Sequence, residues 1–170
     1  MHPAIRRLLV GALFLPLVAL VVACGGGNPD ETRWASAQAE SRGKPAVAKE
    51  ALPGKDFNKF FPKAETPWDL TYKQEKQGTA IASLKKDGKE VAMLTVFDTI
   101  SEPDVAKDYK EATEALAGCP LVAKGSKGTA LLVANRFQVQ VRSMDDSFGE
   151  DDRKEWLKKF DLDGIAKLND

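Results

Sequence analysis

Asp87-Gly88 separates two β-rich runs, TAIASLKK and KEVAMLTVFD, within residues 79–98. A two-residue hairpin turn of the tight type requires positive φ at both central positions, and Asp-Gly is one of the pairs that adopt it readily. The pattern therefore predicts an antiparallel hairpin over residues 79–98. Residues 91–97 are apolar on both sides of the strand, so we expect this strand to lie in the middle of a sheet.

A second hairpin is predicted over residues 128–143, where GTALLVANRFQVQVRS turns near Ala134-Asn135. Apolar and polar residues alternate in its second half, which is typical of a strand with one buried face. Each hairpin follows another predicted strand, residues 68–76 before the first hairpin and residues 121–127 before the second. The chain therefore contains two successive groups of three strands.

Each group of strands is followed by a stretch with helix signals, residues 101–118 and residues 147–160. Ser101 and Ser147 are each followed three residues later by an acid, the spacing of a capping box at a helix N-terminus. In the first stretch, the apolar residues expected on one helix face are Val105, Tyr109, Ala112 and Leu116.

The same order, three strands and a helix, thus occurs twice. Gly78-Thr79-Ala80 in the first unit matches Gly128-Thr129-Ala130 in the second. This match suggests a duplicated βββα unit, although two ordinary βββα stretches could share it by coincidence. Either way, the sequence predicts an α+β fold: a two-layer structure with an antiparallel sheet of about six strands and helices on one face.

The N-terminal residues have the pattern of an export signal. Arg6 and Arg7 precede an apolar run over residues 8–23, and no acidic residue occurs before Asp30. The run is shorter than the roughly 20 residues that a membrane-spanning helix needs. We therefore expect a cleaved signal peptide, with an uncleaved N-terminal anchor as the alternative.

Val21-Val22-Ala23-Cys24 resembles the lipobox of bacterial lipoproteins. This resemblance, which covers residues 1–24, implies that the Cys24 thiol is joined to diacylglycerol, that residues 1–23 are removed, and that the new amino terminus is acylated. Acyl chains bind membranes with about 0.8 kcal/mol per buried CH₂, so two or three chains give stable anchoring. The resemblance implies a protein held at a bacterial membrane and facing the periplasm or the exterior. Gly25, rather than Asp, implies the outer membrane if the host has two membranes.

Residues 24–55 are expected to form the lipidated cysteine and a flexible tether. They are rich in Ala, Glu, Lys, Ser and Pro, and Trp34 is their only aromatic residue, a composition that buries too little apolar surface to fold. Phe57, Phe60 and Phe61 mark the start of packed structure, and we expect a single α+β domain over residues 56–170. A wedge of these phenylalanines that dips into the membrane is the alternative.

The residue inventory excludes several kinds of chemistry. His2 is the only histidine and belongs to the predicted signal peptide, so the mature chain has no histidine for catalysis or for metal binding. With Cys24 lipidated, Cys119 has no disulfide partner; we expect a small buried side chain there, with a reactive thiol as the alternative. Removing Arg6 and Arg7 leaves 23 basic residues against 25 acidic ones, which argues against nucleic-acid binding.

The densest group of carboxylates comprises Asp145, Asp146, Glu150, Asp151 and Asp152. A calcium site is one interpretation, because hard cations prefer clustered oxygen ligands, but the spacing does not match an EF-hand loop. Acids in the first turn of a helix also interact favourably with the helix dipole. The sequence therefore predicts helix-start charges, with no metal and no cofactor.

These observations predict a membrane-anchored, non-catalytic binding or interaction module of the bacterial cell envelope. Its partner would be an envelope protein or a cell-wall component. One alternative is a periplasmic carrier of an apolar ligand, with a pocket between the sheet and the helices ringed by Met93, Phe97, Tyr109 and Trp156. The other alternative is an envelope hydrolase that uses carboxylates alone.

Overall fold

The computed structural model describes residues 48–169. The predicted signal peptide, Cys24 and most of the predicted tether lie outside these residues. The strands of the domain are β1 (Trp68–Lys76), β2 (Thr79–Lys86), β3 (Lys89–Asp98), β4 (Glu114–Leu116), β5 (Cys119–Lys124), β6 (Gly128–Val133) and β7 (Phe137–Ser143).

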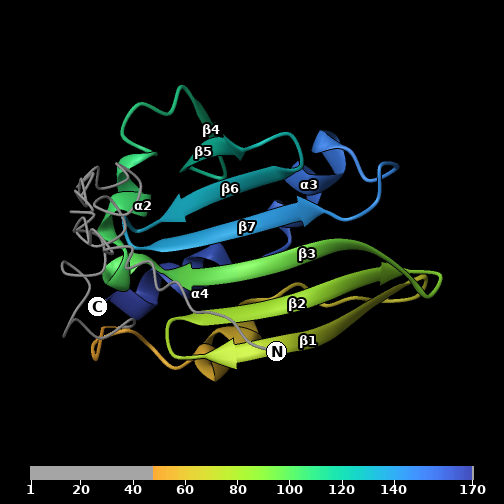
Figure 1. The fold of residues 1–170 in the computed structure, drawn as a ribbon, viewed down its shortest axis with the longest axis horizontal. Helices are drawn as coiled ribbons and strands as arrows, with labels where there is room; N and C mark the ends of the chain where they lie inside the picture. The colour runs from red at the N-terminus through yellow and green to blue at the C-terminus, as the bar shows by residue number, and fades with distance from the viewer. Residues whose placement is uncertain (1–47, 170) are drawn as a thin grey trace, which may run out of the picture. The chain divides into compact units, whose positions relative to one another are not determined.

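All seven strands form one antiparallel sheet in the order β1-β2-β3-β7-β6-β5-β4 (Figure 1). The predicted α+β fold is confirmed, and β4 is the strand that the sequence did not predict. The order is symmetric about the β3–β7 pair: β1-β2-β3 lies on one side and β7-β6-β5 on the other. This is the arrangement expected of two similar three-stranded units.

Both predicted hairpin turns are present and have the expected backbone. Asp87 and Gly88 have φ values of 50° and 80°, and Ala134 and Asn135 have φ values of 49° and 55°. Turns with two positive φ values match the right-handed twist of the flanking strands. Local turn chemistry therefore fixes the two hairpins that meet at the centre of the sheet.

Helical segments cover one face of the sheet, behind the strands in Figure 1. The segment η1 packs against β1 and β2, α3 packs against β6 and β7, and α4 contacts η1 and β6. The helical elements are η1 (Gly54–Phe60), η2 (Thr99–Ser101), α2 (Pro103–Lys107), α3 (Glu150–Lys158), α4 (Leu162–Ala166) and η3 (Lys167–Asn169).

The core lies between the sheet and this helical layer. Phe57, Phe60 and Phe61 are at most 6% exposed, so they point into the domain and do not form a membrane wedge. Phe57 packs edge-on against Phe137 of β7, with ring centroids 5.9 Å apart. Trp68 and Trp156 pack edge-on, with ring centroids 5.0 Å apart, and close the other end of the core. Burying large side chains of this kind contributes about 1.5–3 kcal/mol each.

The predicted helix over residues 101–118 is wrong. Only Pro103–Lys107 is helical, and Glu114–Leu116 forms β4 instead. Ala117 and Gly118 both have positive φ, so they make a two-residue turn that pairs β4 with β5. The apolar spacing of the segment fits a helix, but pairing at the edge of the sheet stabilises the strand instead. Ala106 of α2 also packs on the face opposite the helical layer.

The second predicted helix starts later than expected. It covers Glu150–Lys158, and its N-cap is Gly149 rather than Ser147. The Asp152 carboxylate accepts a hydrogen bond of 2.8 Å from the Gly149 N–H, while the Ser147 hydroxyl donates to Asp145. Two capping patterns overlap in this acidic stretch, Ser147 with Glu150 and Gly149 with Asp152. The helix begins at the second of them.

The predicted tether is also too long at its C-terminal end, because the domain starts by residue 48. The Ala48 N–H donates to the Ser101 hydroxyl at 2.8 Å, and the Gly78 N–H donates to the Leu52 carbonyl at 2.6 Å. Ala51 is only 4% exposed. Gly54 lies so close to β2 that a Cβ there would be 2.2 Å from the Thr79 carbonyl oxygen. Composition suggested a loose segment, but backbone hydrogen bonds hold it in place.

We expect a chain that begins at residue 54 to be less stable than one that begins at residue 45. The shorter chain loses the Leu52 N–H and carbonyl, which bond Asp98 and Gly78. It also loses the Glu50 carbonyl, which accepts from Arg136. At about 1 kcal/mol per hydrogen bond, the free energy of unfolding should fall by about 2–3 kcal/mol. Urea denaturation of both chains measures this difference. Equal stability would show that residues 48–53 do not belong to the domain.

Candidate functional site

On one face of the sheet, strands β2, β3 and β7 are not covered by any helix or strand among residues 48–169. Cross-strand partners share a face, and the pairs on this side include Ile81↔Thr95, Thr95↔Gln140 and Phe97↔Gln138. We call this surface the open face; its residues are Ile81, Ser83, Met93, Thr95, Phe97, Gln138, Gln140 and Arg142. Ser83 and Gln138 are buried beneath their neighbours, and the other six are partly or fully exposed.

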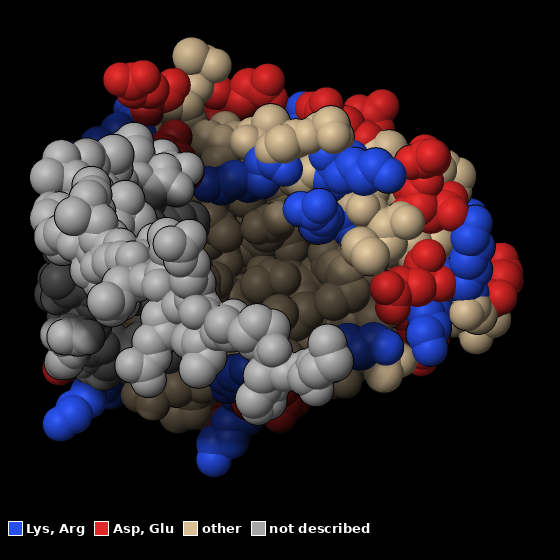
Figure 2. Space-filling model, viewed as in Figure 1, with Lys and Arg blue, Asp and Glu red and all other residues tan. Residues whose placement is uncertain are grey.

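Figure 2 looks onto the open face and shows a hollow at its centre. The hollow is lined by uncharged residues, and Lys and Arg side chains occur along its border (Figure 2). Ile81, Met93 and Phe97 are partly exposed on this side, between threonine and glutamine side chains. In contrast, the helix-covered side of β3 places Ala92, Leu94 and Val96 at 0% exposure. The open face therefore offers apolar contact area flanked by hydrogen-bonding groups.

Two charged residues, Glu90 beside Ser83 and Arg142 on the open face itself, differ in their partners. Glu90 bonds the Ser83 hydroxyl and lies 3.9 Å from the Lys73 ammonium group. Arg142 pairs with Met93 across the strands, is exposed, and has no carboxylate within 4.0 Å among residues 48–169. Arg142 is therefore free to bind an acidic or carbonyl group of a partner.

A pocket of about 460 Å³ opens between α2 and strands β5 and β6, on the same side of the sheet. Its walls include Ala106, Tyr109 and Leu132, and we call it the Tyr109 pocket. The Tyr109 hydroxyl donates a hydrogen bond of 2.9 Å to Gln138 of the open face. Burial strongly raises the pKa of Tyr109, and the nearby charge of Asp108 raises it further, so the phenol stays neutral.

The four residues predicted to ring one apolar pocket do not come together. Met93 and Phe97 lie on the open face, and Tyr109 packs over the same side of the sheet beside Gln138. Trp156 belongs to the opposite, helix-covered face, where it is 3% exposed and packs edge-on against Trp68. The alternation of side chains along β3 shows which residues share a face of the sheet, but not which face the helices cover. The predicted pocket therefore combined residues from both faces.

The acidic cluster forms ion pairs with lysines and caps a helix. Asp145 contacts Lys89, Asp146 lies 2.8 Å from Lys127, and Glu150 lies 2.8 Å from Lys154. Glu150, Asp151 and Asp152 occupy the first turn of α3, as predicted. Within residues 48–169 no group of three or more His, Cys, Asp or Glu side chains is placed to hold a metal ion.

Cys119 lies at the start of β5 and is partly buried. Burial, with a smaller effect of the Asp163 charge, raises the pKa of its thiol. A raised pKa lowers the thiolate fraction at neutral pH and with it the reactivity of the sulfur. The side chain is thus only partly buried rather than buried as predicted, while its raised pKa favours an unreactive thiol over a reactive one.

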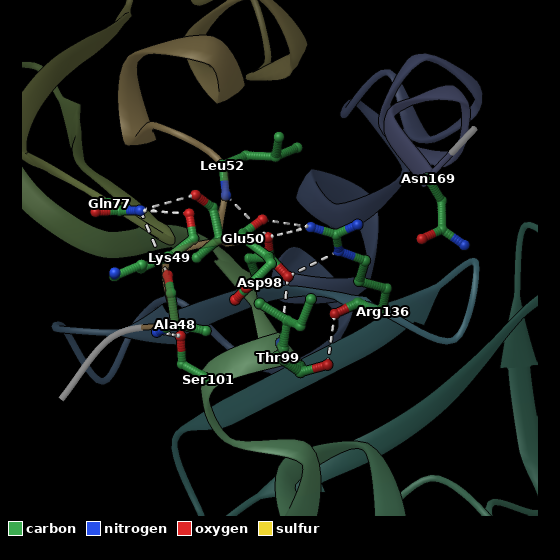
Figure 3. A network of polar contacts seen from close by, with 12 residues as sticks. Ala48, Lys49, Glu50, Leu52, Gln77, Asp98, Thr99, Ser101, Arg136 and Asn169 are labelled. Atoms are coloured by element: carbon green, nitrogen blue, oxygen red, sulfur yellow. Dashed lines mark hydrogen bonds and ion pairs between the residues drawn. The ribbon is translucent and has the colours of Figure 1, made fainter. Parts of the chain in front are cut away.

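Sequence reasoning missed two buried polar centres. Arg153 of α3 is 6% exposed and donates to the Thr129 and Ser143 hydroxyls, both at 2.9 Å. Asp98, at the end of β3, is 0% exposed and binds the Arg136 guanidinium through two hydrogen bonds of 2.8 and 2.9 Å (Figure 3). Both centres join elements far apart in the sequence, so no local pattern reveals them.

The chain matches no protein-family model, and no similar curated protein or solved structure was found. In residues 48–169, no helix has the length and apolar character needed to span a membrane.

Proposed function

We propose that the chain is a lipid-anchored, non-catalytic binding module of the bacterial cell envelope and that the open face is its binding surface. Cys24 would carry the lipid, and the residues between Cys24 and Ala48 would connect it to the domain. The partner would be an envelope protein or a cell-wall component. The observation that carries the proposal is the contrast between the two faces of the sheet.

The open face has the chemistry of an interaction surface. Ile81, Met93 and Phe97 supply apolar area at its centre, and methionine adapts its shape to different partners. Gln140 and Arg142 supply hydrogen bonds beside them. Uncharged centres with polar borders are typical of protein interaction sites.

The carboxylates support a non-catalytic role more than a hydrolytic one. A carboxylate general acid needs a raised pKa in a dry environment. The pKa of Asp145 is lowered by its bonds to Lys89 and Ser147, and the pKa of Glu150 is lowered by Lys154. These carboxylates therefore stay ionised at neutral pH and lack the property that an acid catalyst requires.

Photo-crosslinking in intact cells tests the proposal. A photoreactive phenylalanine analogue replaces Phe97 on the open face, and the matched control replaces Tyr72, which is 40% exposed and packs on Phe61 of the covered face. We expect a discrete adduct from position 97 and none of the same mass from position 72. Adding Met93→Glu should reduce the position-97 adduct at least fivefold, because it places a charge in the apolar centre.

A thermal melt of each variant checks that its domain stays folded, since Met93 is a partly exposed surface residue. The same adducts from both positions, or an adduct that Met93→Glu leaves unchanged, would show that the open face is not the binding surface.

A further inference from the structure

The Tyr109 pocket is lined mainly by apolar side chains. Leu132 and Tyr109 are each 4% exposed and form a small cluster with Ala130, separate from the main core. The Tyr109 hydroxyl is already bonded to Gln138, so the residue presents its ring. Pro103 and Pro120 add walls that carry no backbone N–H. The interior therefore suits a hydrocarbon rather than a polar group.

The charges of the pocket are all of one sign. Lys107 and Lys110 line it, and none of its lining residues is acidic. Lys110 has no carboxylate within 4.0 Å among the described residues. Lys107 pairs with Asp104, but the two side chains are 64% and 84% exposed, so water screens this pair and makes it weak. Two cations thus stand beside an apolar cavity.

Size also restricts the ligand. A volume of about 460 Å³ lies in the range of small-molecule sites, about 300–1,000 Å³. An amphipathic helix of a partner protein would need a long groove, whereas a single aliphatic chain fits a compact pocket. Asn135 at the turn between β6 and β7 adds one polar group to the lining.

From this combination we propose that the Tyr109 pocket binds a single-chain anionic amphiphile of the fatty-carboxylate type. The aliphatic chain packs on Tyr109, Leu132 and Ala106, and the carboxylate binds between Lys107 and Lys110. The site adjoins the open face at the Tyr109–Gln138 hydrogen bond, but none of its lining residues belongs to the open face. It does not depend on Cys24 either, so it can fail or hold independently of the proposed function.

Laurate, kept below its micelle concentration, is the probe. The protein is the mature chain, residues 24–170, carrying Cys24→Ser so that no covalent lipid competes. We expect one laurate per chain by calorimetry, with NMR shifts centred on the amides of Tyr109 and Leu132. Dodecyl maltoside, a neutral amphiphile of the same chain length, should bind at least tenfold more weakly.

Two variants test the two halves of the site. Ala106→Trp fills the cavity from its partly exposed wall and should weaken laurate binding at least tenfold. Lys107→Ser/Lys110→Ser removes both cations and should weaken it about tenfold, since each exposed ionic contact contributes up to about 1 kcal/mol. The matched control, Lys158→Ser/Lys167→Ser, removes two exposed lysines elsewhere and should leave laurate affinity within twofold.

Several results would overturn the proposal. They are no saturable laurate binding, binding that Ala106→Trp leaves unchanged, equal affinity for the neutral amphiphile, or shifts centred away from Tyr109. Binding of an acidic, leucine-containing peptide with no binding of laurate would assign the pocket to a protein partner instead. The NMR measurement uses no pocket variant, so it decides the question even if Ala106→Trp fails to fold.

Discussion

Asp98→Asn is expected to lower the free energy of unfolding by about 3 kcal/mol, the lower end of the cost of breaking a buried ion pair, because the Arg136 side chain is 20% exposed. Asp98 is 0% exposed and accepts four hydrogen bonds. Two come from the Arg136 side chain, and the others come from the Leu52 and Ile100 N–H groups. Asparagine keeps the shape but loses the charge and one acceptor oxygen. Arg136 would then lack its carboxylate, and at least one buried donor would lack a partner.

The effect should be visible in both chemical and thermal denaturation. Urea titration at pH 7 gives the change in free energy directly. In a domain of this size, the midpoint of thermal unfolding should fall by roughly 10–15 °C. Asp146→Asn is the matched control, because Asp146 also pairs with a cation but is 92% exposed; its effect should stay below about 1 kcal/mol. A loss below about 1 kcal/mol for Asp98→Asn would mean that the pair is not needed for stability.

The same prediction has a pH dependence of definite sign. Burial by itself raises the pKa of Asp98, but the hydrogen bonds from Arg136, Leu52 and Ile100 outweigh it and lower the pKa. A carboxyl whose pKa is lower in the folded chain stabilises the fold above its unfolded pKa, about 3.9. That contribution is lost as the pH falls through the folded pKa. The difference between the natural chain and Asp98→Asn should therefore be largest near neutral pH and shrink below about pH 4.

The parts of the fold that the sequence predicted are those with local causes. The turns at Asp87-Gly88 and Ala134-Asn135 depend on backbone preferences of adjacent residues, and both hairpins formed as predicted. The segment 101–118 shows where local evidence fails. Its apolar residues fit a helix, yet Glu114–Leu116 pairs with β5, a contact that only the sheet as a whole makes favourable.

The start of the domain has the same explanation. Leu52 and Asp98 are 46 residues apart, and Arg136 and Asp98 are 38 apart, yet all three meet in one network (Figure 3). The composition around residue 50 indicates a tether. It cannot reveal that this segment is ordered, because the hydrogen bonds that hold the segment come from distant strands. Met93 and Phe97 were predicted to line a pocket between the sheet and the helices, but α3, α4 and η1 pack on the opposite face of the sheet.

The proposal that Cys24 carries the lipid predicts an all-or-none result. A thiol is the nucleophile that accepts diacylglycerol, and a serine hydroxyl does not replace it. In cells given an alkyne-tagged fatty acid, the natural chain should be labelled and Cys24→Ser should carry no label. Loss of two or three acyl chains removes the anchoring free energy, at about 0.8 kcal/mol per buried CH₂.

The other cysteine provides the control for that experiment. Cys119→Ser keeps Cys24 and changes a partly buried position of β5, so its label should equal that of the natural chain. Membrane fractionation alone would not decide the question, because an unprocessed Cys24→Ser precursor could stay in the membrane through its apolar run, residues 8–23. The mass of the mature chain does decide it: the natural chain should begin at a lipidated Cys24, and the variant should keep residues 1–23. Label on Cys24→Ser, or its loss in Cys119→Ser, would contradict the anchor and require another explanation for the apolar run that ends at Cys24.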